Sequence, residues 1–255
     1  MNILKAEDIS VSYDSSLVIK DVSLNLNKGE VVCLLGASGI GKSTLFGVLS
    51  GVHLPDLGRV FLKGKEITGK AGEISYMQQR DLLLPYKTIM ENVSLPLIIN
   101  GASKKDAYMA AGAYFESFGL TGCEKKYPNQ LSGGMRQRAA LLRTYLFKSD
   151  IILLDEPFSD LDVITKHAMQ TWFLSIAEKL GVTALFITHD IDEAIFLSDR
   201  IYVMTGKPGK IANEINILSQ KPRQAEFAVS AEFNAYKRKI MDILKNDSFF
   251  SFVGL

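Results

Sequence analysis

Short stretches in the N-terminal third of the chain alternate apolar and polar residues, the pattern of strands with one buried face. The alternation occurs at Ile9–Tyr13 and again at Val22–Asn27. Two more apolar runs, Arg59–Leu62 and Lys65–Ile67, flank a Lys-Gly pair, an arrangement typical of a β-hairpin. We therefore expect an antiparallel sheet within roughly the first seventy residues.

From Ile151 onward the chain changes to nearly continuous apolar runs separated by longer helical patterns. The runs lie at Ile151–Leu154, Thr183–Ile187 and Arg200–Met204. Such runs are expected of strands buried on both faces, and strands that alternate with helices favour a parallel sheet. The other elements expected here are a helix at Val163–Leu180, a strand at Ile211–Ile217 and a helix at Ala231–Leu244.

The segment between these two patterns is predicted to be helical. Ser103–Asp106 can cap one helix, and Ser132–Gly134 opens a second helix that runs from Met135 to Phe147. The apolar positions expected for the first helix are Ala107, Met109, Ala110, Ala113, Tyr114, Phe118 and Leu120.

A glycine-rich segment joins the apolar run Val31–Leu35 to the apolar pattern Leu45–Leu49. Its four residues between Gly36 and the Gly-Lys-Ser step fit the phosphate-binding loop. The segment is Gly36, Ala37, Ser38, Gly39, Ile40, Gly41, Lys42, Ser43 and Thr44. Glycines let backbone amides approach phosphate oxygens, Lys42 adds a positive charge, and the Ser43 hydroxyl can hold Mg²⁺. The alternative is a turn that only joins a strand to a helix; the agreement of spacing, lysine, hydroxyl and flanking elements favours binding of a nucleoside triphosphate.

Two acids follow the apolar run Ile151–Leu154. At the carboxyl end of a parallel strand such acids point into the ligand crevice. Asp155 fits a carboxylate that organises Mg²⁺, and Glu156 fits the base that orients and polarises an attacking water. A helix cap after a core strand is the alternative. Beside a phosphate loop the catalytic interpretation is favoured, because the two are halves of one site.

Composition narrows the class of protein. The 29 basic and 28 acidic residues give a net charge of +1, which does not support a strongly basic nucleic-acid binder, so no nucleic-acid partner is expected. The cysteines, Cys33 and Cys123, have no spacing that suggests a disulfide framework or a zinc site, and a reducing, cytosolic setting suits them.

We find no signal peptide and no apolar stretch of about eighteen residues, so contact with a membrane is expected to need a partner.

The Leu131–Met135 segment, Leu-Ser-Gly-Gly-Met, taken with the phosphate loop and Leu153–Pro157, resembles the ATPase subunit of an ABC transporter over nearly the whole chain. The resemblance implies an α/β fold: a P-loop NTPase core with a parallel sheet, an N-terminal antiparallel β subdomain and an inserted helical subdomain. It implies one domain over residues 1–255, with a core at 1–87 and 148–255 and the helical subdomain at about 88–147. ATP and Mg²⁺ are the ligands that it implies, and ATP hydrolysis is the reaction.

The resemblance further implies a head-to-tail homodimer. In this family the segment matching Ser132, Gly133 and Gly134 closes over the ATP held by the phosphate loop of the other subunit. Tyr13 matches the position that stacks an aromatic ring on adenine, although the residue alone would suggest a core tyrosine. Asp162 matches the position that helps couple the two sites, and His189 matches the switch histidine that contacts the γ-phosphate.

A glutamine that contacts the metal is also implied. The family's glutamine usually lies six residues before the proline that is Pro85 here, which selects Gln79 and leaves Gln78 as the alternative. This segment joins the nucleotide site to the helical subdomain, so it is the expected route from hydrolysis to a membrane partner.

Three segments, Leu82–Thr88, Arg200–Met204 and Lys207–Ile211, are similar to the importer branch for nitrate, sulfonates, taurine and thiamine-precursor pyrimidines. The resemblance then implies a peripheral protein at the cytoplasmic face of the cell membrane, where dimer closure drives solute uptake through a transmembrane permease. An extracytoplasmic solute-binding protein would be an indirect partner. An ABC exporter subunit, a non-transport ABC ATPase and a regulator without turnover are the alternatives. Departures from the family pattern, at Ile40, Tyr86, Met135 and 142–145, remove no catalytic group.

Overall fold

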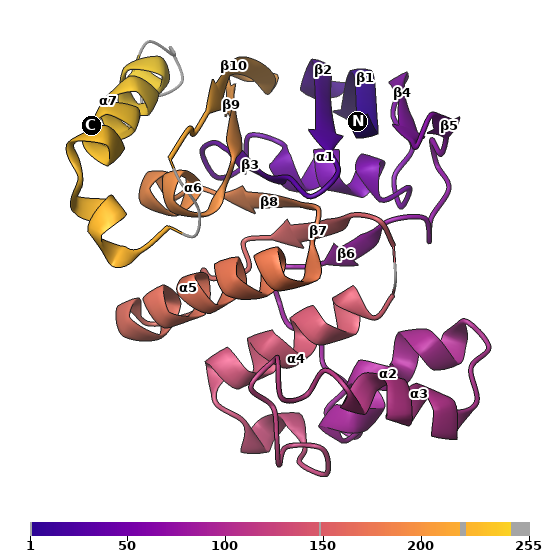
Figure 1. The fold of residues 1–255 in the computed structure, drawn as a ribbon. Helices are drawn as coiled ribbons and strands as arrows, with labels where there is room; N and C mark the ends of the chain where they lie inside the picture. The colour runs from indigo at the N-terminus through magenta and orange to yellow at the C-terminus, as the bar shows by residue number, and fades with distance from the viewer. Residues whose placement is uncertain (1, 148, 220–222, 246–255) are drawn as a thin grey trace.

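The computed structural model describes residues 2–147, 149–219 and 223–245. Its central sheet is built from β3 (Val31–Leu35), β6 (Ser75–Met77), β7 (Ile152–Asp155), β8 (Ala184–Thr188), β9 (Arg200–Thr205) and β10 (Lys210–Asn216). The strand order is β10-β9-β3-β8-β7-β6 (Figure 1). All neighbours pair in parallel except β10, which runs antiparallel to β9 at one edge. The parallel sheet predicted from the apolar runs is confirmed.

Strand β3 is buried along its whole length because its two faces enter different hydrophobic clusters. Val31, Cys33 and Leu35 belong to one cluster, whereas Val32 and Leu34 belong to the other. Side chains alternate between the two faces of a strand, so a strand covered on both faces needs a continuous apolar run. This explains why the sequence before the glycine-rich loop shows no alternation.

A second, antiparallel sheet covers one side of the molecule, as predicted. It contains β1 (Asn2–Tyr13), β2 (Ser16–Asn27), β4 (Leu57–Leu62) and β5 (Lys65–Glu66), in the order β2-β1-β4-β5. Helix α1 (Lys42–Leu49) follows the glycine-rich loop, and its Leu45 and Phe46 pack in the cluster that the two sheets share. The expected hairpin is present, with Leu62 paired to Lys65.

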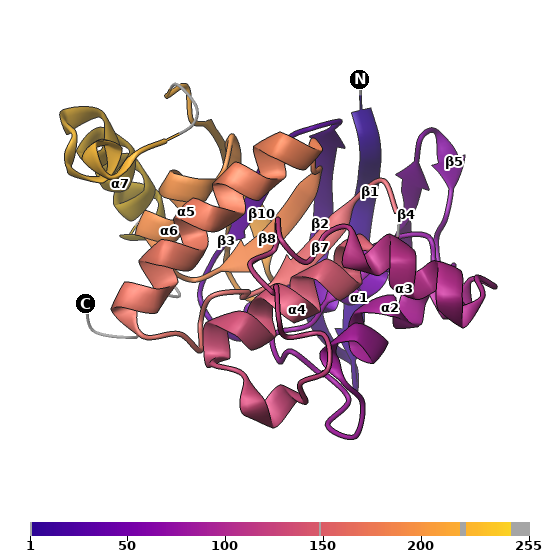
Figure 2. The same ribbon diagram turned by 60° about the horizontal axis from the view of Figure 1, so that its bottom comes forward.

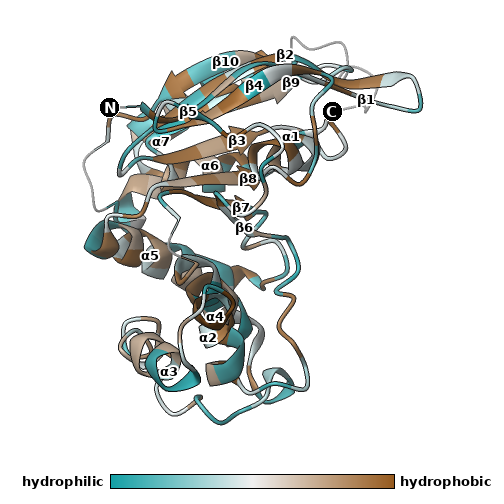
Figure 3. Ribbon diagram, turned by 90° about the vertical axis from the view of Figure 1, so that its right-hand side faces the viewer, coloured by the Kyte–Doolittle hydropathy of each residue, from teal (hydrophilic) through white to brown (hydrophobic). Residues whose placement is uncertain are grey.

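Three helices form a group that extends from the β6 edge of the central sheet, on the side away from the antiparallel sheet, with α4 packed against β6 (Figures 1 and 3). They are α2 (Ile89–Ile99), α3 (Lys104–Gly112) and α4 (Gly133–Tyr145), with the short 3-10 helix η1 (Pro128–Gln130) before α4. Helix α2 lies within the helical subdomain expected at about 88–147, but the sequence patterns did not predict it as a separate helix. It begins at a capping box in which Thr88 and Glu91 satisfy each other's backbone N–H groups.

Helix α3 corrects the expectation for this region. It begins after Ser103, whose hydroxyl accepts from the Asp106 N–H as predicted, but it ends at Gly112 instead of reaching Leu120. Glycine is a poor helix former, and the chain continues through turns. Met109 is 69% exposed and does not belong to the apolar face, since it lies about 200° around the helix from buried Ala107.

Helices α5 (Val163–Leu180) and α6 (Ile191–Leu197) cover the sheet face opposite α1 (Figure 2). Helix α5 has the predicted bounds, capped by Asp162 at its start and by Gly181 with a φ of 61° at its end. The short α6 and β6 were not predicted. The chain continues through η2 (Ala225–Val229) to α7 (Ala231–Lys245), the expected C-terminal helix. No helix in the described ranges is both long and apolar enough to cross a membrane.

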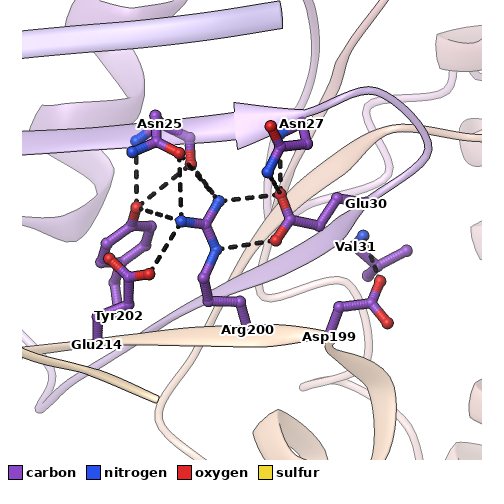
Figure 4. A network of polar contacts seen from close by, with 8 residues as sticks. All are labelled: Asn25, Asn27, Glu30, Val31, Asp199, Arg200, Tyr202 and Glu214. Atoms are coloured by element: carbon purple, nitrogen blue, oxygen red, sulfur yellow. Dashed lines mark hydrogen bonds and ion pairs between the residues drawn. The ribbon is translucent and has the colours of Figure 1, made fainter. Parts of the chain in front are cut away.

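Arg200 ties the two sheets together at the ends of the parallel strands that lie away from the glycine-rich loop (Figure 4). Its guanidinium donates to both carboxylate oxygens of Glu30, at 2.8 and 2.9 Å, and to the Asn25 carbonyl of β2 at 2.8 Å. It also donates to Glu214 of β10 at 3.0 Å. A bidentate, nearly buried pair of this kind fixes geometry as well as contributing energy. We assign this cluster a role in holding the sheets in register.

Candidate functional site

The glycine-rich loop leaves β3 and turns directly into α1. Gly39 and Gly41 adopt φ angles of 76° and 103°, a region that favours glycine. The Lys42 ammonium donates to the carbonyl oxygens of Gly36 and Ala37, at 2.8 Å each. Burial lowers the pKa of Lys42, while the charges of Glu156 and Asp155 oppose that shift. The lysine is thus held across its own loop, in a position from which it can move to an anion.

The back of this loop rests on the turn between β9 and β10. A Cβ atom on Gly209 would overlap the Ile40 carbonyl oxygen, so only glycine fits there without displacing the loop. The Gly209 N–H donates to the Val18 carbonyl at 2.8 Å, and the Lys20 N–H donates back to the Gly209 carbonyl at 3.0 Å. The Lys207–Ile211 segment noted in the sequence therefore supports the phosphate loop and the chain around Val18.

A pocket of about 360 Å³ opens over the loop. It is lined by Val18, Ser38, Gly39, Gly41, Lys42, Ser43, Thr44, Gln79 and Glu156. Gln79 comes two residues after the end of β6, and Glu156 follows β7. The structure thus brings Gln79 to the pocket, whereas Gln78 is not among its lining residues. The loop, the glutamine and the acid predicted from separate parts of the sequence share one cavity.

Asp155 lies at the carboxyl end of β7 and is buried. The Tyr76 hydroxyl donates to its Oδ2 at 3.1 Å, and its carboxylate also hydrogen-bonds the Ser43 hydroxyl. Burial raises the pKa of Asp155, although both hydrogen bonds oppose the shift. Ser43 and Asp155 therefore present two oxygen atoms side by side, the donor type that Mg²⁺ prefers. Tyr76 is a site residue that the sequence did not reveal, because its position on β6 became known only with the strand pairing.

Glu156 has a strained backbone. Its φ of 45° is unusual for a residue with a side chain, and it is held there by Ser159, whose N–H and hydroxyl both donate to the Glu156 carbonyl. The conformation directs the carboxylate toward His189, whose Nδ1 lies 3.1 Å from Glu156 Oε1. His189 follows β8, the neighbour of β7 in the sheet. The acid and the histidine predicted as catalytic residues are thus in contact.

Comparison with known proteins identifies this arrangement. A sequence profile of the ABC transporter family matches residues 19–159. The chain is also 43% identical over 249 residues to the formylaminopyrimidine import ATP-binding protein ThiZ of Halalkalibacterium halodurans, a match that covers 96% of this chain and 98% of that protein. The chain belongs to the ABC transporter family.

Two further comparisons agree with this assignment. The nitrate import ATP-binding protein NrtD of Synechocystis sp. is 34% identical over 237 residues, which covers 91% of this chain and 89% of that protein. A dimeric ATP-binding cassette in a post-hydrolysis state, bound to ADP and Pi, superposes with a TM-score of 0.73 at 28% identity, covering 86% of this chain and all of that one. As an ABC cassette, the chain binds and hydrolyses ATP.

In this ABC cassette, Tyr13 is an exposed residue at the end of β1, not a core tyrosine. Its side chain is 47% exposed, and its hydroxyl lies 3.3 Å from Nδ1 of His53. The end of β1 is held by Asp56, which accepts from the Ser12 N–H at 2.6 Å and donates its own N–H to the Ser10 carbonyl at 2.9 Å. Tyr13 does not line the pocket over the phosphate loop, so the position of its ring next to a base remains a prediction.

The Leu-Ser-Gly-Gly segment of the cassette lies away from the pocket. The Ser132 hydroxyl caps α4 by accepting from the Met135 N–H at 3.3 Å, and Ser132 and Gly133 are both exposed. Asp162 is exposed as well and caps α5 by accepting from the N–H groups of Ile164 and Thr165. None of these residues lines the pocket over the phosphate loop within the same chain.

Two arginines of α4 hold the chain that follows Gln79, and the sequence did not reveal their part in the expected connection between the nucleotide site and the helical subdomain. Arg143 donates to the carbonyl oxygens of Leu82 and Asp81, at 2.8 and 2.6 Å. Arg136 contacts the Asp81 carboxylate at 3.3 Å. The helical group and the segment carrying Gln79 are thus mechanically joined.

Proposed function

We propose that this chain is the ATP-hydrolysing subunit of a bacterial ABC importer that couples closure of an ATP-bound dimer to solute uptake. The observation that carries the proposal is the shared pocket: phosphate loop, Gln79 and Glu156 line one cavity, and His189 lies 3.1 Å from Glu156. In its proposed use, the loop from Gly36 to Thr44 binds the phosphates of ATP through backbone N–H groups and Lys42.

Mg²⁺ fits a set of oxygen donors beside the phosphate loop. Ser43, which lines the pocket, shares a hydrogen bond with the Asp155 carboxylate, and Gln79, which lines the same pocket, has a side-chain oxygen of the type that Mg²⁺ prefers. These three residues would hold the ion, which neutralises charge on the phosphates when it is bound. Gln79 is preferred over Gln78 because it faces the cavity.

Glu156 is proposed as the general base. An accepting carboxylate oriented by a strained backbone can take a proton from water that attacks the terminal phosphate. His189, held by Glu156, is proposed to contact the γ-phosphate and so to distinguish ATP from ADP. Tyr13 is proposed to stack on adenine, since an exposed ring at the end of a rigid strand offers a face to a base.

A head-to-tail homodimer completes the proposed site. Ser132, Gly133 and Gly134 at the start of α4 are aligned with a helix N-terminus, which favours an anion, yet they lie outside the pocket of their own chain. Asp162 likewise does not line the pocket of its own chain. We infer that these residues meet the ATP of a second copy, and the dimeric cassette bound to ADP and Pi supports this inference.

The helical group, about residues 88–147, is proposed as the subdomain that meets the permease. It is joined to the nucleotide pocket through Arg143 and the segment after Gln79. Large apolar side chains are exposed at this connection and on the helical group: Leu82 is 50% and Tyr86 72% exposed, and Ile99, the last residue of α2, is 72% exposed. An apolar surface of this kind fits a membrane-protein partner, which would place the chain at the cytoplasmic face of the cell membrane.

The solute is proposed from the relatives alone. Their names point to import of formylaminopyrimidine, nitrate or taurine, so we propose a pyrimidine precursor, nitrate, taurine or another sulfonate as the solute. Selectivity would reside in the permease and in an extracytoplasmic solute-binding protein, an indirect partner of this chain.

Reconstitution tests the proposal. The chain is co-expressed with a candidate ABC permease from the same genome, the complex is placed in lipid vesicles with a candidate solute-binding protein, and uptake of each candidate solute is measured with and without Mg-ATP. We expect ATP-dependent uptake of one solute class. A chain that hydrolyses ATP but neither copurifies with that permease nor supports uptake would overturn the importer assignment while leaving the ATPase assignment intact.

A further inference from the structure

A partly buried ion cluster links α5 to the start of α6, next to His189 in the sequence. Lys166 Nζ lies 2.8 Å from Asp190 Oδ2 and 2.9 Å from Glu193 Oε2. Gln170, one turn further along α5, donates to the same Glu193 oxygen at 3.3 Å. The Glu193 side chain is only 3% exposed. An acid so buried needs a cation or a proton, and Lys166 is the cation that contacts it.

The contacts of Lys166 close a ring around the predicted catalytic residues. On one side, Lys166 lies in the first turn of α5, where its backbone N–H makes the ordinary helical hydrogen bond to the carbonyl of the N-cap residue Asp162, at 2.7 Å. Asp162 ends the loop that begins at Glu156, so the side chain of Lys166 ties the end of that loop to Asp190. On the other side, its ammonium holds Asp190, the residue directly after His189. The ring is completed by the 3.1 Å contact between His189 and Glu156.

Asp190 connects this ion cluster to His189, because it is the next residue in the chain. Its Oδ1 accepts from the N–H groups of Asp192 and Glu193 and so caps α6, while its Oδ2 is left for Lys166. Its own N–H donates to the Thr188 hydroxyl at 3.0 Å. The backbone on both sides of His189 is thus fixed, and Lys166 fixes it relative to α5 in particular.

We propose that Lys166 is a positioning residue that fixes the position of His189 relative to Glu156 and Asp162. The catalytic pair and the loop that faces the second subunit would then move as one unit. The inference rests on the proposed roles of those three residues. Lys166 itself does not line the pocket over the phosphate loop. Its loss should therefore lower the rate of the chemical step and leave nucleotide binding in place.

The test compares Lys166→Met and Lys166→Arg with a matched control. Lys237→Met removes another lysine that pairs with α6, through Asp192, but at a site where both partners are largely exposed. For each protein, kcat is measured per ATP-binding site at a temperature well below its melting point, together with the Kd for ATP. We expect Lys166→Met to lower kcat about 10- to 100-fold, the scale of a small misplacement of catalytic groups. Its Kd should stay within about twofold of wild type, because the phosphate loop is untouched.

Lys166→Arg keeps the charge and should restore kcat to within about threefold of wild type, and Lys237→Met should match wild type. A purely structural role would reduce the yield of folded protein without reducing kcat per site or being rescued by arginine. If Lys166→Met does not fold, Lys166→Gln takes its place, since its shorter, uncharged side chain keeps a polar group but cannot pair as a cation with both acids. Wild-type kcat in Lys166→Met, or in Lys166→Gln where it replaces that variant, overturns the proposal. Failure of the proposed function is a separate result, in which the wild-type protein itself hydrolyses no ATP.

Discussion

His189 Nδ1 lies 3.1 Å from Oε1 of Glu156, although the two residues are 33 positions apart in the chain. The contact exists because β7 and β8 are neighbours in the parallel sheet and both residues follow the carboxyl ends of those strands. It brings a carboxylate and an imidazole to one edge of the nucleotide pocket, where one can serve as a base and the other can sense the phosphate.

Glu156→Gln should slow ATP hydrolysis by roughly 10²–10⁴-fold and leave ATP binding intact, since the amide keeps the shape but cannot take a proton. Steady-state phosphate release and a direct binding assay measure the two quantities separately. Glu178→Gln, an exposed acid on α5, is the matched control and should behave as wild type. Near-normal turnover in Glu156→Gln would remove this residue from the role of base.

Lys42→Ala should weaken ATP binding itself. A hydrogen bond to a charged group contributes about 1.5–3 kcal/mol, so the Kd should rise at least about tenfold. Isothermal titration with a nucleotide is the measurement, because a loss of activity alone would not separate binding from chemistry. An unchanged Kd would contradict the proposed phosphate contact of the Lys42 ammonium.

Local patterns predicted much of the fold and of this site. The glycine-rich loop, the acids after β7 and the bounds of α5 depend on residues that are close in sequence, so they could be found there. The Tyr76–Asp155 and Lys166–Glu193 contacts could not, because they depend on which strands and helices become neighbours. Helix α2 was missed because its Pro96 weakened the helical pattern, while Thr88 and Glu91 supply a cap that stabilises it.

Tyr13→Ala should weaken ATP binding by about 10- to 100-fold, since stacking of a base on an aromatic ring contributes about 1–3 kcal/mol. Tyr13→Phe keeps the ring and loses only the contact with His53, so its Kd should stay within about threefold of wild type. Tyr108→Ala, on α3, is the control for loss of a ring elsewhere. Equal affinities for Tyr13→Ala and wild type would exclude the stacking role.

Gly209→Ala should destabilise the protein and lower its affinity for ATP. The added Cβ would meet the backbone carbonyl of Ile40, which cannot turn away without moving the phosphate loop. Overpacking costs about 1–3 kcal/mol, or a few degrees of melting temperature in a chain of this size. Gly112→Ala is the control, because its nearest neighbour is a methionine carbon at 3.8 Å. A Gly209→Ala protein with the wild-type melting temperature and Kd would show that the turn between β9 and β10 gives the loop no support.

Asp155→Asn should raise the melting temperature of the nucleotide-free protein at pH 7, even as it impairs hydrolysis. Burial raises the pKa of Asp155 in the folded state, against the hydrogen bonds from Ser43 and Tyr76. The folded protein therefore binds a proton there more tightly than the unfolded chain does, and stability falls as pH rises through the folded-state pKa. Asparagine carries no charge at any pH, so the gain should be largest at neutral pH and should shrink as pH falls toward about 4, the ordinary pKa of aspartate.

Asp162→Asn is expected to change the melting temperature at pH 7 in the opposite direction. Hydrogen bonds from Thr165, first from its side chain and then from its backbone, lower the pKa of Asp162 below its ordinary value. Its ionised form thus contributes stability above the ordinary pKa, and this contribution is lost as pH falls through the folded-state value. Asp162→Asn should therefore melt at or below the wild-type temperature at pH 7. An Asp155→Asn protein that melted at or below the wild-type temperature at neutral pH would refute a stability cost from burying the Asp155 carboxylate. An Asp162→Asn protein that melted above the wild-type temperature would refute a stabilising role for the hydrogen bonds to Asp162.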